Sequence, residues 1–410
     1  MVVPFSPDPE RLAAVREALP SLGAGIYLNT GSVGPIPAES AAAMADFANW
    51  ELTTGRAHVD DWPEVLQRMA EARASVAAIL TTDPVAIALT HSTTDGMNAF
   101  AGAIDWRPGD RAVTTCLEHA GAVGPLYALR ARGIAVDFVD IGDGGDDART
   151  LAAVEAAMTP QTRLVVASHV TWMTGAVLPV AAIAEIAHAG GALMAVDGAQ
   201  SVGAIRVDFE ATGADAYAVA AQKWLLGPEG MGALAVRPEL ATRLHPAFAG
   251  YLSFETVDAV GTAVFQPDAR RFEWGSFHRP SIIGMARSIS WMSMYVGLDW
   301  IYARGAATAR RAAERLATIP GVQVLTPTHQ MASLVTFRIE GWPAATALAE
   351  LGARVFAIAR TVDALDAVRI SVGFFTSDDE VERFAEAVAL LAGHTPETVP
   401  ARRTLTMLGG

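Results

Sequence analysis

The chain has 410 residues, of which 51% are hydrophobic and 18% are charged. This length and composition indicate a compact, well-buried protein of two domains. The formal net charge of −14 argues against nonspecific binding to nucleic acid or to an anionic membrane, because both require a basic surface. No stretch is apolar over the roughly 20 residues of a membrane helix and no signal peptide is visible, so we expect a cytoplasmic protein. The single cysteine, Cys116, excludes an intrachain disulfide and a thiolate metal cluster; we expect it to be a small buried residue, and we expect no metal site.

Short apolar runs alternate with alanine-rich helical patterns between about residues 85 and 240. Residues 164–169 and 193–197 are predicted to form buried strands, and residues 179–188 between them are predicted to form a helix. This alternation predicts an α/β fold with a mostly parallel sheet and helices on both faces. A long helix is then predicted from Ser281 to about Leu316.

The last hundred residues mix strands with helices, as a small α+β domain would. Strands are predicted at 333–339 and 367–372, and helices at 344–351 and 379–391. We therefore predict a large domain over residues 26–280, a smaller domain made of residues 1–25 together with 281–395, and a polar tail over 396–410.

Two segments 26 positions apart carry the strongest chemical signal: Asp197 ends a buried run, and Lys223 stands just ahead of the glycine-rich turn 227–230. A carboxylate at the carboxyl end of a parallel strand could stabilise a pyridinium, or it could cap the next helix. A buried lysine has a lowered pKa and keeps a free amine for imine formation, whereas the plain alternative is a surface lysine before a turn. Together the segments are typical of a pyridoxal phosphate (PLP) site, with the lysine carrying the cofactor and the acid keeping its ring nitrogen protonated.

A possible phosphate cradle follows the apolar run 85–89. Ser92, Thr93 and Thr94 precede a helical pattern, so their hydroxyls and the free N–H groups could hold a phosphate, or they could simply cap the helix.

Three further residues are candidates by their position in apparent strands. His119, after Glu118, follows the run 112–115 and could stack on a flat cofactor, although a lone histidine there is more often structural. Arg369 must be paired, either with a substrate carboxylate or with a neighbouring acid, and Arg360 has the same two alternatives.

The combination of Asp197-x-x-Gln200, Lys223-Trp224 and Gly227-Pro228-x-Gly230 resembles the fold-type-I PLP enzymes of aminotransferase class V, from Tyr27 to about Leu391. The resemblance implies a PLP-dependent transferase-like fold, with a mostly parallel seven-stranded sheet in the large domain and a smaller α+β C-terminal domain. It implies that Lys223 is the cofactor lysine and proton shuttle, that Asp197 is the partner of the ring nitrogen, and that His119 stacks on the ring.

The resemblance also implies the remaining contacts. Gln200 would bond the ring hydroxyl, Thr93 and Thr94 the phosphate, and Ser276 the phosphate of the other subunit, so that a homodimer shares its active sites. The full implied cofactor set is Ser92, Thr93, Thr94, His119, Asp197, Ala199, Gln200, Gln222, Lys223 and Ser276. The implied substrate set is Asn29, Gly31, Trp172, Arg360 and Arg369, with Arg369 holding the α-carboxylate.

Segments 27–37 and 168–179 resemble most closely the cysteine/cystine C–S lyases and the isopenicillin-N-epimerase-like enzymes. Cysteine desulfurases are a poorer match, because they need a catalytic cysteine before the arginine strand and residues 361–368 contain none. Three residues depart from the family pattern, namely Gln222 in place of a histidine, Ala220 in place of a serine or threonine, and Trp172 near the place of an asparagine. These departures could mark a specialised substrate or a diverted reaction.

These features predict a homodimeric PLP-dependent lyase that acts on cysteine or a cysteine S-conjugate by Cα deprotonation and β-elimination, with a natural-product pathway as one setting. The alternatives are an epimerase, which needs a second proton donor, a transaminase or oxidative decarboxylase, and a non-catalytic binding protein, against which Lys223 argues. The expected partner is a small amino acid, with no nucleic acid or membrane.

Residues 24–36, 172, 274 and 277–279 are expected to shape the pocket, with Arg279 paired to substrate or to Glu273.

Overall fold

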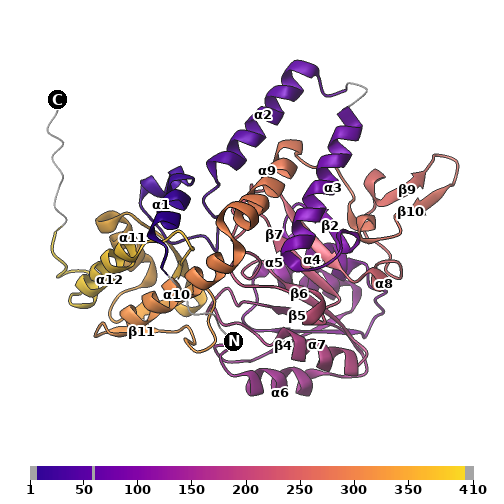
Figure 1. Ribbon diagram of the computed structural model, residues 1–410. Coiled ribbons are helices and arrows are strands. Elements are labelled where there is room, and N and C mark those ends of the chain that lie inside the picture. The colour runs from indigo at the N-terminus through magenta and orange to yellow at the C-terminus, as the bar shows by residue number, and fades with distance from the viewer. Residues whose placement is uncertain (1–6, 58–60, 402–410) are drawn as a thin grey trace.

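The computed structural model describes residues 7–57 and 61–401, and its centre is a seven-stranded sheet (Figure 1). In spatial order the strands are β2 (Ile87–Thr90), β8 (Gly232–Val236), β7 (Ala216–Ala220), β6 (Leu193–Asp197), β5 (Thr162–Ser168), β3 (Arg111–Thr115) and β4 (Ala135–Val139). Strands β3 to β7 run parallel to one another, whereas β8 runs antiparallel to both β7 and β2. The predicted α/β class and mostly parallel seven-stranded sheet are confirmed.

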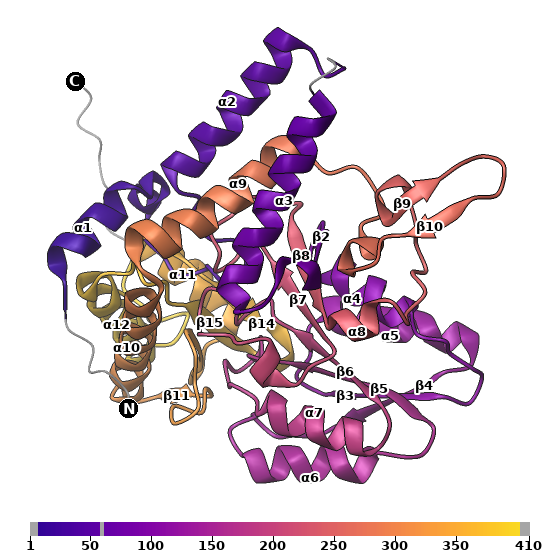
Figure 2. The same ribbon diagram turned by 45° about the vertical axis from the view of Figure 1, so that its right-hand side comes forward.

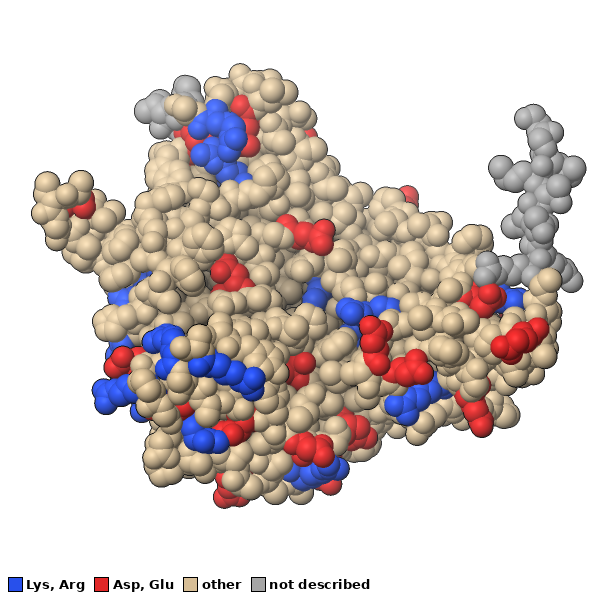
Figure 3. All heavy atoms as spheres, turned by 180° about the vertical axis from the view of Figure 1, so that it is seen from behind, with Lys and Arg blue, Asp and Glu red and all other residues tan. Residues whose placement is uncertain are grey.

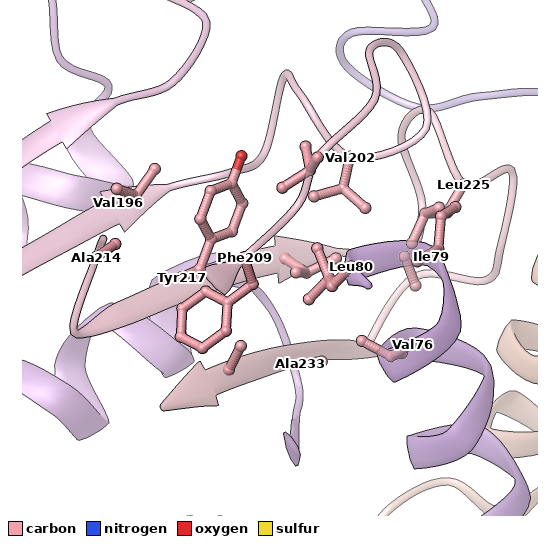
Figure 4. Packing of buried hydrophobic residues seen from close by; sticks show 14 of the residues in the cluster. Val76, Ile79, Leu80, Val196, Val202, Phe209, Ala214, Tyr217, Leu225 and Ala233 are labelled. Atoms are coloured by element: carbon pink, nitrogen blue, oxygen red, sulfur yellow. The ribbon is translucent and has the colours of Figure 1, made fainter. Parts of the chain in front are cut away.

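Helices cover both faces of this sheet (Figure 2). One face carries α3 (Asp61–Leu80), α6 (Asp147–Ala157) and α7 (Val180–Ala189), and the other carries α4 (Thr93–Gly102), α5 (Ala120–Leu129) and the short α8 (Pro238–Ala241). On the first face the strands present large side chains, among them Val196 and Tyr217, which pack beside Phe209 and Leu80 (Figure 4).

The second face of the sheet carries several small residues. Strands β2, β3, β6 and β7 present alanines there, which are Ala88, Ala112, Ala195, Ala216 and Ala218. Because alanine is small, α4 lies close to the sheet: a Cβ added to Gly96 would be 3.3 Å from the Cβ of Ala218. This close approach brings the first turn of α4 next to the carboxyl ends of the parallel strands.

A second, four-stranded antiparallel sheet lies in the C-terminal part of the chain. Its order is β11 (Val322–Val324), β12 (Leu334–Ile339), β15 (Ala367–Ser371) and β14 (Arg360–Val362), and it packs with α10 (Leu298–Ala317), α11 (Ala344–Val355) and α12 (Asp378–Ala392). Strand β1 (Ile26–Tyr27) pairs in parallel with β13 (Ala357–Ile358), so the start of the predicted large domain is bonded to this C-terminal part. The predicted domain boundaries themselves stay a prediction.

The predicted helix from Ser281 to Leu316 is wrong as a single element. It is divided into α9 (Arg279–Ser290), a π-helical turn (Trp291–Val296) and α10. Gly297 separates them with φ +94°, a backbone conformation that glycine adopts at little cost and that ends the helical hydrogen bonding. Helix α1 (Pro9–Glu17) lies at the other end of the chain, beside α12 in Figure 1.

Helices α2 (Ala38–Thr54) and α3 project together from the body, with α9 packed along both (Figures 1 and 2). A hairpin of β9 (Phe254–Val257) and β10 (Ala263–Phe265) projects separately. None of the helices within the described residues is both long and apolar enough to cross a membrane. On the face shown in Figure 3, basic and acidic side chains are interspersed.

The predicted tail divides into two parts. The first part contacts the body, since Val399 packs against the small-sheet core and Arg354 Nη2 donates to Pro400 O at 2.8 Å. Residues 402–410, like residues 1–6 at the other end, lie outside the described residues.

Candidate active site

A pocket of about 240 Å³ lies where the carboxyl ends of the parallel strands meet the small sheet. Of the predicted site residues, only Asn29 and Ser276 are outside its wall. The lining residues are Gly31, Ser32, Ser92, Thr93, Thr94, His119, Gly121, Trp172, Asp197, Ala199, Gln200, Ala220, Gln222, Lys223, Arg360 and Arg369. The fold therefore brings together residues that lie as much as 338 positions apart in the sequence, from Gly31 to Arg369. Their individual roles stay predictions.

A larger groove, of about 710 Å³, runs along β11 and β12 of the small sheet. Two of its polar side chains already serve the fold: Arg338 Nε donates to Leu365 O at 2.7 Å, and Asp366 Oδ1 accepts from Ala344 N at 2.9 Å. We therefore place the chemistry in the smaller pocket, where polar groups converge.

Lys223 is the only lysine among the 410 residues. It follows β7 in a turn held against the N-terminal segment, where Gly34 N donates to Gln222 O at 2.7 Å. Any Cβ at position 34 would overlap the carbonyl oxygen of Lys223, so this contact requires glycine. Burial lowers the pKa of Lys223 to about 8; Asp197 opposes this shift, and Arg369 and Arg360 add to it. The amine is therefore partly uncharged near neutral pH.

Asp197 and Gln200 are fixed by local hydrogen bonds. Asp197 Oδ1 accepts from Ala199 N at 2.8 Å, which orients the carboxylate at the end of β6. The Gln200 amide donates through Nε2 to Gly31 O at 2.8 Å and accepts from Trp224 Nε1 through Oε1 at 2.8 Å. Because one N–H of Nε2 is used in this way, a single N–H is left for the predicted contact with a ring hydroxyl.

A hydrogen bond at the start of α5 fixes the tautomer of the neutral His119 ring. Its Nδ1 accepts from Gly121 N at 3.0 Å, so the neutral ring carries its proton on Nε2. Burial and the nearby Lys223 lower the pKa of His119, which keeps the ring neutral at neutral pH. The ring meets Trp172 edge-on, with the ring centres 5.3 Å apart.

The predicted phosphate cradle lies at the first turn of α4. Ser92 is the N-cap, and its hydroxyl accepts from Asp95 N at 3.1 Å, so this residue does cap the helix. Thr93 and Thr94 follow in the first turn, whose free N–H groups favour an anion. A Cβ on Gly121 would lie 2.5 Å from Thr94 Oγ1, and this glycine therefore lets α5 approach the cradle.

Arg369 and Arg360 are partners in the register of β15 and β14, so both side chains lie on one side of the small sheet. Arg369 is 0% exposed, and its Nη1 donates to Trp172 O at 2.8 Å. Burial and Arg360 lower the pKa of Arg369 to about 9, which still leaves it charged at neutral pH. Arg360 is half-buried and lies 5.4 Å from the centre of the Trp172 ring. Within the described residues neither arginine has the acidic neighbour that the plain alternative required.

The two predicted residues outside the pocket serve other contacts. Asn29 bridges to Ser371, and its Oδ1 accepts from Ser32 Oγ at 2.8 Å. Ser276 lies at the surface, where its hydroxyl is 2.9 Å from that of Tyr251.

Some of the residues expected to shape the pocket are elsewhere. Trp274 and Phe277 pack against His91 instead, with ring centres 5.3 and 4.7 Å away. The expected pair of Arg279 with Glu273 is wrong: Arg279 pairs with Asp61 at 2.7 Å and Glu51 at 3.1 Å, and it is not among the residues that line the pocket. Glu273 pairs with Arg73 at 2.9 Å, 200 positions away on α3, and such distant partners leave no local signal in the sequence.

The sequence reasoning missed two residues of the site and misjudged one. Gly121 lines the pocket beside predicted residues, and Glu118 lies buried behind it, whereas Ser32 belongs to the segment 24–36 that was expected to shape the pocket. Cys116 is exposed rather than buried, because it follows the last residue of β3 and points out of the sheet core. For Lys223, the strongest available signal was that the chain contains no second lysine.

The pocket wall fits PLP. Five buried polar atoms in it have no hydrogen-bond partner within the described residues, and these are Thr93 Oγ1, Trp172 Nε1, Gln222 Oε1, and Nε and Nη2 of Arg369. Buried polar groups are rarely left unpaired in proteins without a ligand or water to meet them. A hydroxyl at a helix start, a carboxylate at a strand end and one amine between them correspond to the phosphate, ring nitrogen and aldehyde of PLP.

A family model for aminotransferase class V matches residues 26–384. The chain is 31% identical over 332 residues to a probable cysteine desulfurase of Methanothermobacter thermautotrophicus, covering 80% of this chain and 82% of that one. It is 30% identical over 403 residues to the isopenicillin N epimerase of Streptomyces clavuligerus, covering 90% and 95%. This chain belongs to the aminotransferase class-V family.

Solved structures agree with this family assignment. The fold matches that of the cystine C–S lyase C-DES, in complex with its reaction product cysteine persulfide, with a TM-score of 0.85 and 25% identity over 90% of this chain and 99% of that one. A C-DES variant with glycine covalently linked to PLP matches with a TM-score of 0.86 and 25% identity, over 94% and 99%. This class-V protein is therefore a PLP-dependent enzyme similar to cysteine desulfurases and C–S lyases.

Proposed function

We propose that this class-V enzyme is a C–S β-lyase that converts cysteine or a cysteine S-conjugate into a thiol, pyruvate and ammonia. One observation carries the proposal. The only lysine of the chain shares a small pocket with Asp197 and with the buried Arg369, whose Nε and Nη2 have no hydrogen-bond partner within the described residues. The likeness to a cystine C–S lyase supports it.

The free edge of Arg369 suits an α-carboxylate. Trp172 O occupies Nη1, which leaves Nε and Nη2, the two N–H groups that point the same way along one edge of the guanidinium. This edge binds a carboxylate through two parallel hydrogen bonds. The substrate would thus be anchored by the group that every amino acid carries.

Lys223 would then take the proton from the substrate Cα, because its lowered pKa provides neutral amine at neutral pH. Bound PLP supplies the electron sink that makes this proton acidic. As the Cα–H bond breaks, the Cβ–S bond breaks and the sulfur leaves as thiolate, which takes up a proton. Water then converts the remaining three-carbon fragment into pyruvate and ammonia.

The connection between β14 and β15 favours this outcome over sulfur transfer. The strands pair as far as Val362 and Ala367, and the turn between them (Asp363–Leu365) holds no cysteine. Cys116, the only cysteine, is exposed after β3 and is not among the lining residues. A desulfurase needs a thiolate that accepts the sulfur, so we expect the sulfur to leave as a free thiol or persulfide.

Epimerisation is the second candidate, because the isopenicillin N epimerase aligns over 90% of the chain. Reprotonation on the opposite face needs a second proton carrier. Apart from Lys223 and Asp197, His119 is the lining side chain that could serve, but its lowered pKa makes it a poor acid at neutral pH. The transaminase and decarboxylase alternatives stay open, as does a natural-product setting.

The test is to mix purified holoenzyme with L-cystine, S-ethyl-L-cysteine and L-cysteine, and to measure pyruvate and the sulfur product, which is cysteine persulfide, ethanethiol or hydrogen sulfide in that order. We expect pyruvate and the sulfur product in equal amounts. Formation of the D-enantiomer with solvent deuterium at Cα and without pyruvate would establish epimerisation instead, and a keto acid that keeps its sulfur would establish transamination.

We also propose a homodimer in which Ser276 completes the partner's cofactor site. Exposed aromatic side chains support it: Tyr251 is 51% exposed, and Trp274 and Trp62 are each 40% exposed beside Ser276 or Tyr251. Apolar patches of this kind mark contact surfaces. Light scattering checks the mass, and a fully active monomer would overturn the shared-site assignment.

A further inference from the structure

Glu118 is a buried acid directly behind the pocket, and no step of the proposed reaction uses it. Its side chain is 7% exposed. Its Oε1 accepts from Thr115 Oγ1 at 2.8 Å and from Ser168 N at 3.0 Å, and its Oε2 lies 2.5 Å from Ser168 Oγ. The carboxyl therefore joins the carboxyl ends of β3 and β5.

One of these strand ends leads directly to His119, and the other lies beside Asp197, so Glu118 is close to both residues that are predicted to contact the PLP ring. Glu118 immediately precedes His119, the N-cap of α5. Ser168 is the register partner of Asp197 on the neighbouring strand β6, and adjacent strands lie about 4.8 Å apart. His169 N also donates to Asp197 O at 3.1 Å. A change at Glu118 thus reaches Asp197 through one residue.

A charge at this position is not needed for the hydrogen bonds. A glutamine would accept from Thr115 and Ser168 equally well, without the cost of burying a carboxylate. Within the described residues no side-chain nitrogen of an arginine, lysine or histidine lies within 4.0 Å of a carboxylate oxygen of Glu118. The groups packed against it are Thr115 on β3, Ser168 on β5, His119 on α5 and Asp197 on β6, and Asp197 is the charge that acts on it.

We propose that Glu118 is a positioning residue that controls the charge behind Asp197 and, through it, the affinity for the protonated ring of PLP. When ionised, it adds a second negative charge behind the partner of the ring nitrogen. When protonated, its Oε2–H donates to Ser168 Oγ while Oε1 keeps its two donors, so the charge changes and the geometry does not. The inference rests on the PLP site and not on the lyase reaction.

Burial raises the pKa of Glu118 to about 7, and Asp197 adds to this, whereas the Ser168 and Thr115 bonds oppose it. The charge therefore changes near neutral pH. Below this range the carboxyl is neutral and resembles a glutamine; above it the second negative charge is present.

The experiment compares the PLP dissociation constants of wild-type and Glu118→Gln apoproteins between about pH 5.5 and 8.5. The pH effects of Lys223 and of the phosphate are common to both proteins and cancel in the ratio. We expect equal affinities at the acidic end and about 3- to 10-fold tighter binding by wild type at the basic end. The ratio should change with a midpoint near pH 7.

A ratio that is the same at every pH would overturn the proposal, because a purely structural role loses affinity without titrating. Ser168→Ala gives an independent check, since it removes a donor that stabilises the charged carboxylate. The ratio of PLP dissociation constants is measured again between Ser168→Ala and the double variant Ser168→Ala/Glu118→Gln. Its midpoint should lie about half a pH unit above that of the wild-type ratio. An unmoved midpoint would also contradict the proposal. Neither readout depends on pyruvate, so this result and the lyase test can fail separately.

Discussion

Arg369 and Arg304 are buried to a similar extent but have opposite surroundings. Arg369 is 0% exposed and Arg304 5% exposed. The guanidinium of Arg304 donates to Phe374 O and Thr376 O, both at 2.8 Å, and so ties α10 to the loop before α12. Arg369 leaves Nε and Nη2 without partners. Unsatisfied buried donors are costly. We therefore infer that Arg304 stabilises the fold, whereas Arg369 has donors free to bind an anion.

The same contrast extends to the two regions around them. At the α10 junction the charged group is paired within the protein, although Trp300 Nε1 and Thr376 Oγ1 there have no partner within the described residues. We expect changes to Arg304 to cost stability. In the pocket several polar groups are unpaired, and we expect changes there to cost binding or turnover while the fold stays intact. The predictions below test whether these two effects can be separated.

The largest expected effect is that of Lys223→Ala, which removes both the cofactor amine and the base. Turnover should fall by about 1,000-fold or more, while the melting temperature of the apoprotein stays the same or rises, because a desolvated amine is lost. Pyruvate release and thermal unfolding measure the two quantities. Activity near that of the wild type would remove the basis of the mechanism.

Covalent loading of PLP should depend on pH through Lys223. Because its pKa is lowered to about 8, about half of the amine is neutral at that pH, roughly 100-fold more than for an ordinary lysine. Loading, trapped by borohydride reduction and counted by mass, should therefore reach half its maximum rate near pH 8. With one lysine in the chain, Lys223→Ala reports the background of the N-terminal amine. A rate still rising above pH 10 would contradict the lowered pKa.

Arg369→Met and Arg304→Met form a matched pair. Arg369→Met should lower kcat/KM by about 10- to 100-fold, because two charge-assisted hydrogen bonds to the substrate are lost, and it should not lower the melting temperature. Arg304→Met should leave kcat/KM unchanged and lower the unfolding free energy by about 2–4 kcal/mol, because two buried carbonyl groups lose their donors. Equal effects on stability would show that the contrast between the two arginines has no functional meaning.

The elements predictable from the sequence are those with a local signal. The strand that ends at Asp197 and the helix before it follow from apolar periodicity, and Lys223 follows from a short motif around it. The contacts that were not predictable join distant segments. Arg279 meets Asp61 across 218 positions and Glu118 meets Ser168 across 50, and neither pairing has a local pattern.

The smallest expected effect concerns Thr93, whose buried Oγ1 has no partner within the described residues. If α4 cradles the phosphate, Thr93→Val should weaken PLP binding by about 10-fold, since one hydrogen bond to a charged phosphate is worth about 1.5 kcal/mol or more. Thr150 on α6 is the control, because its hydroxyl is also buried and unpaired but lies outside the pocket. Thr150→Val should leave PLP binding unchanged. If both variants bind PLP as wild type does, an unpaired hydroxyl is no guide to a ligand in this protein, and the argument from Arg369 would weaken with it.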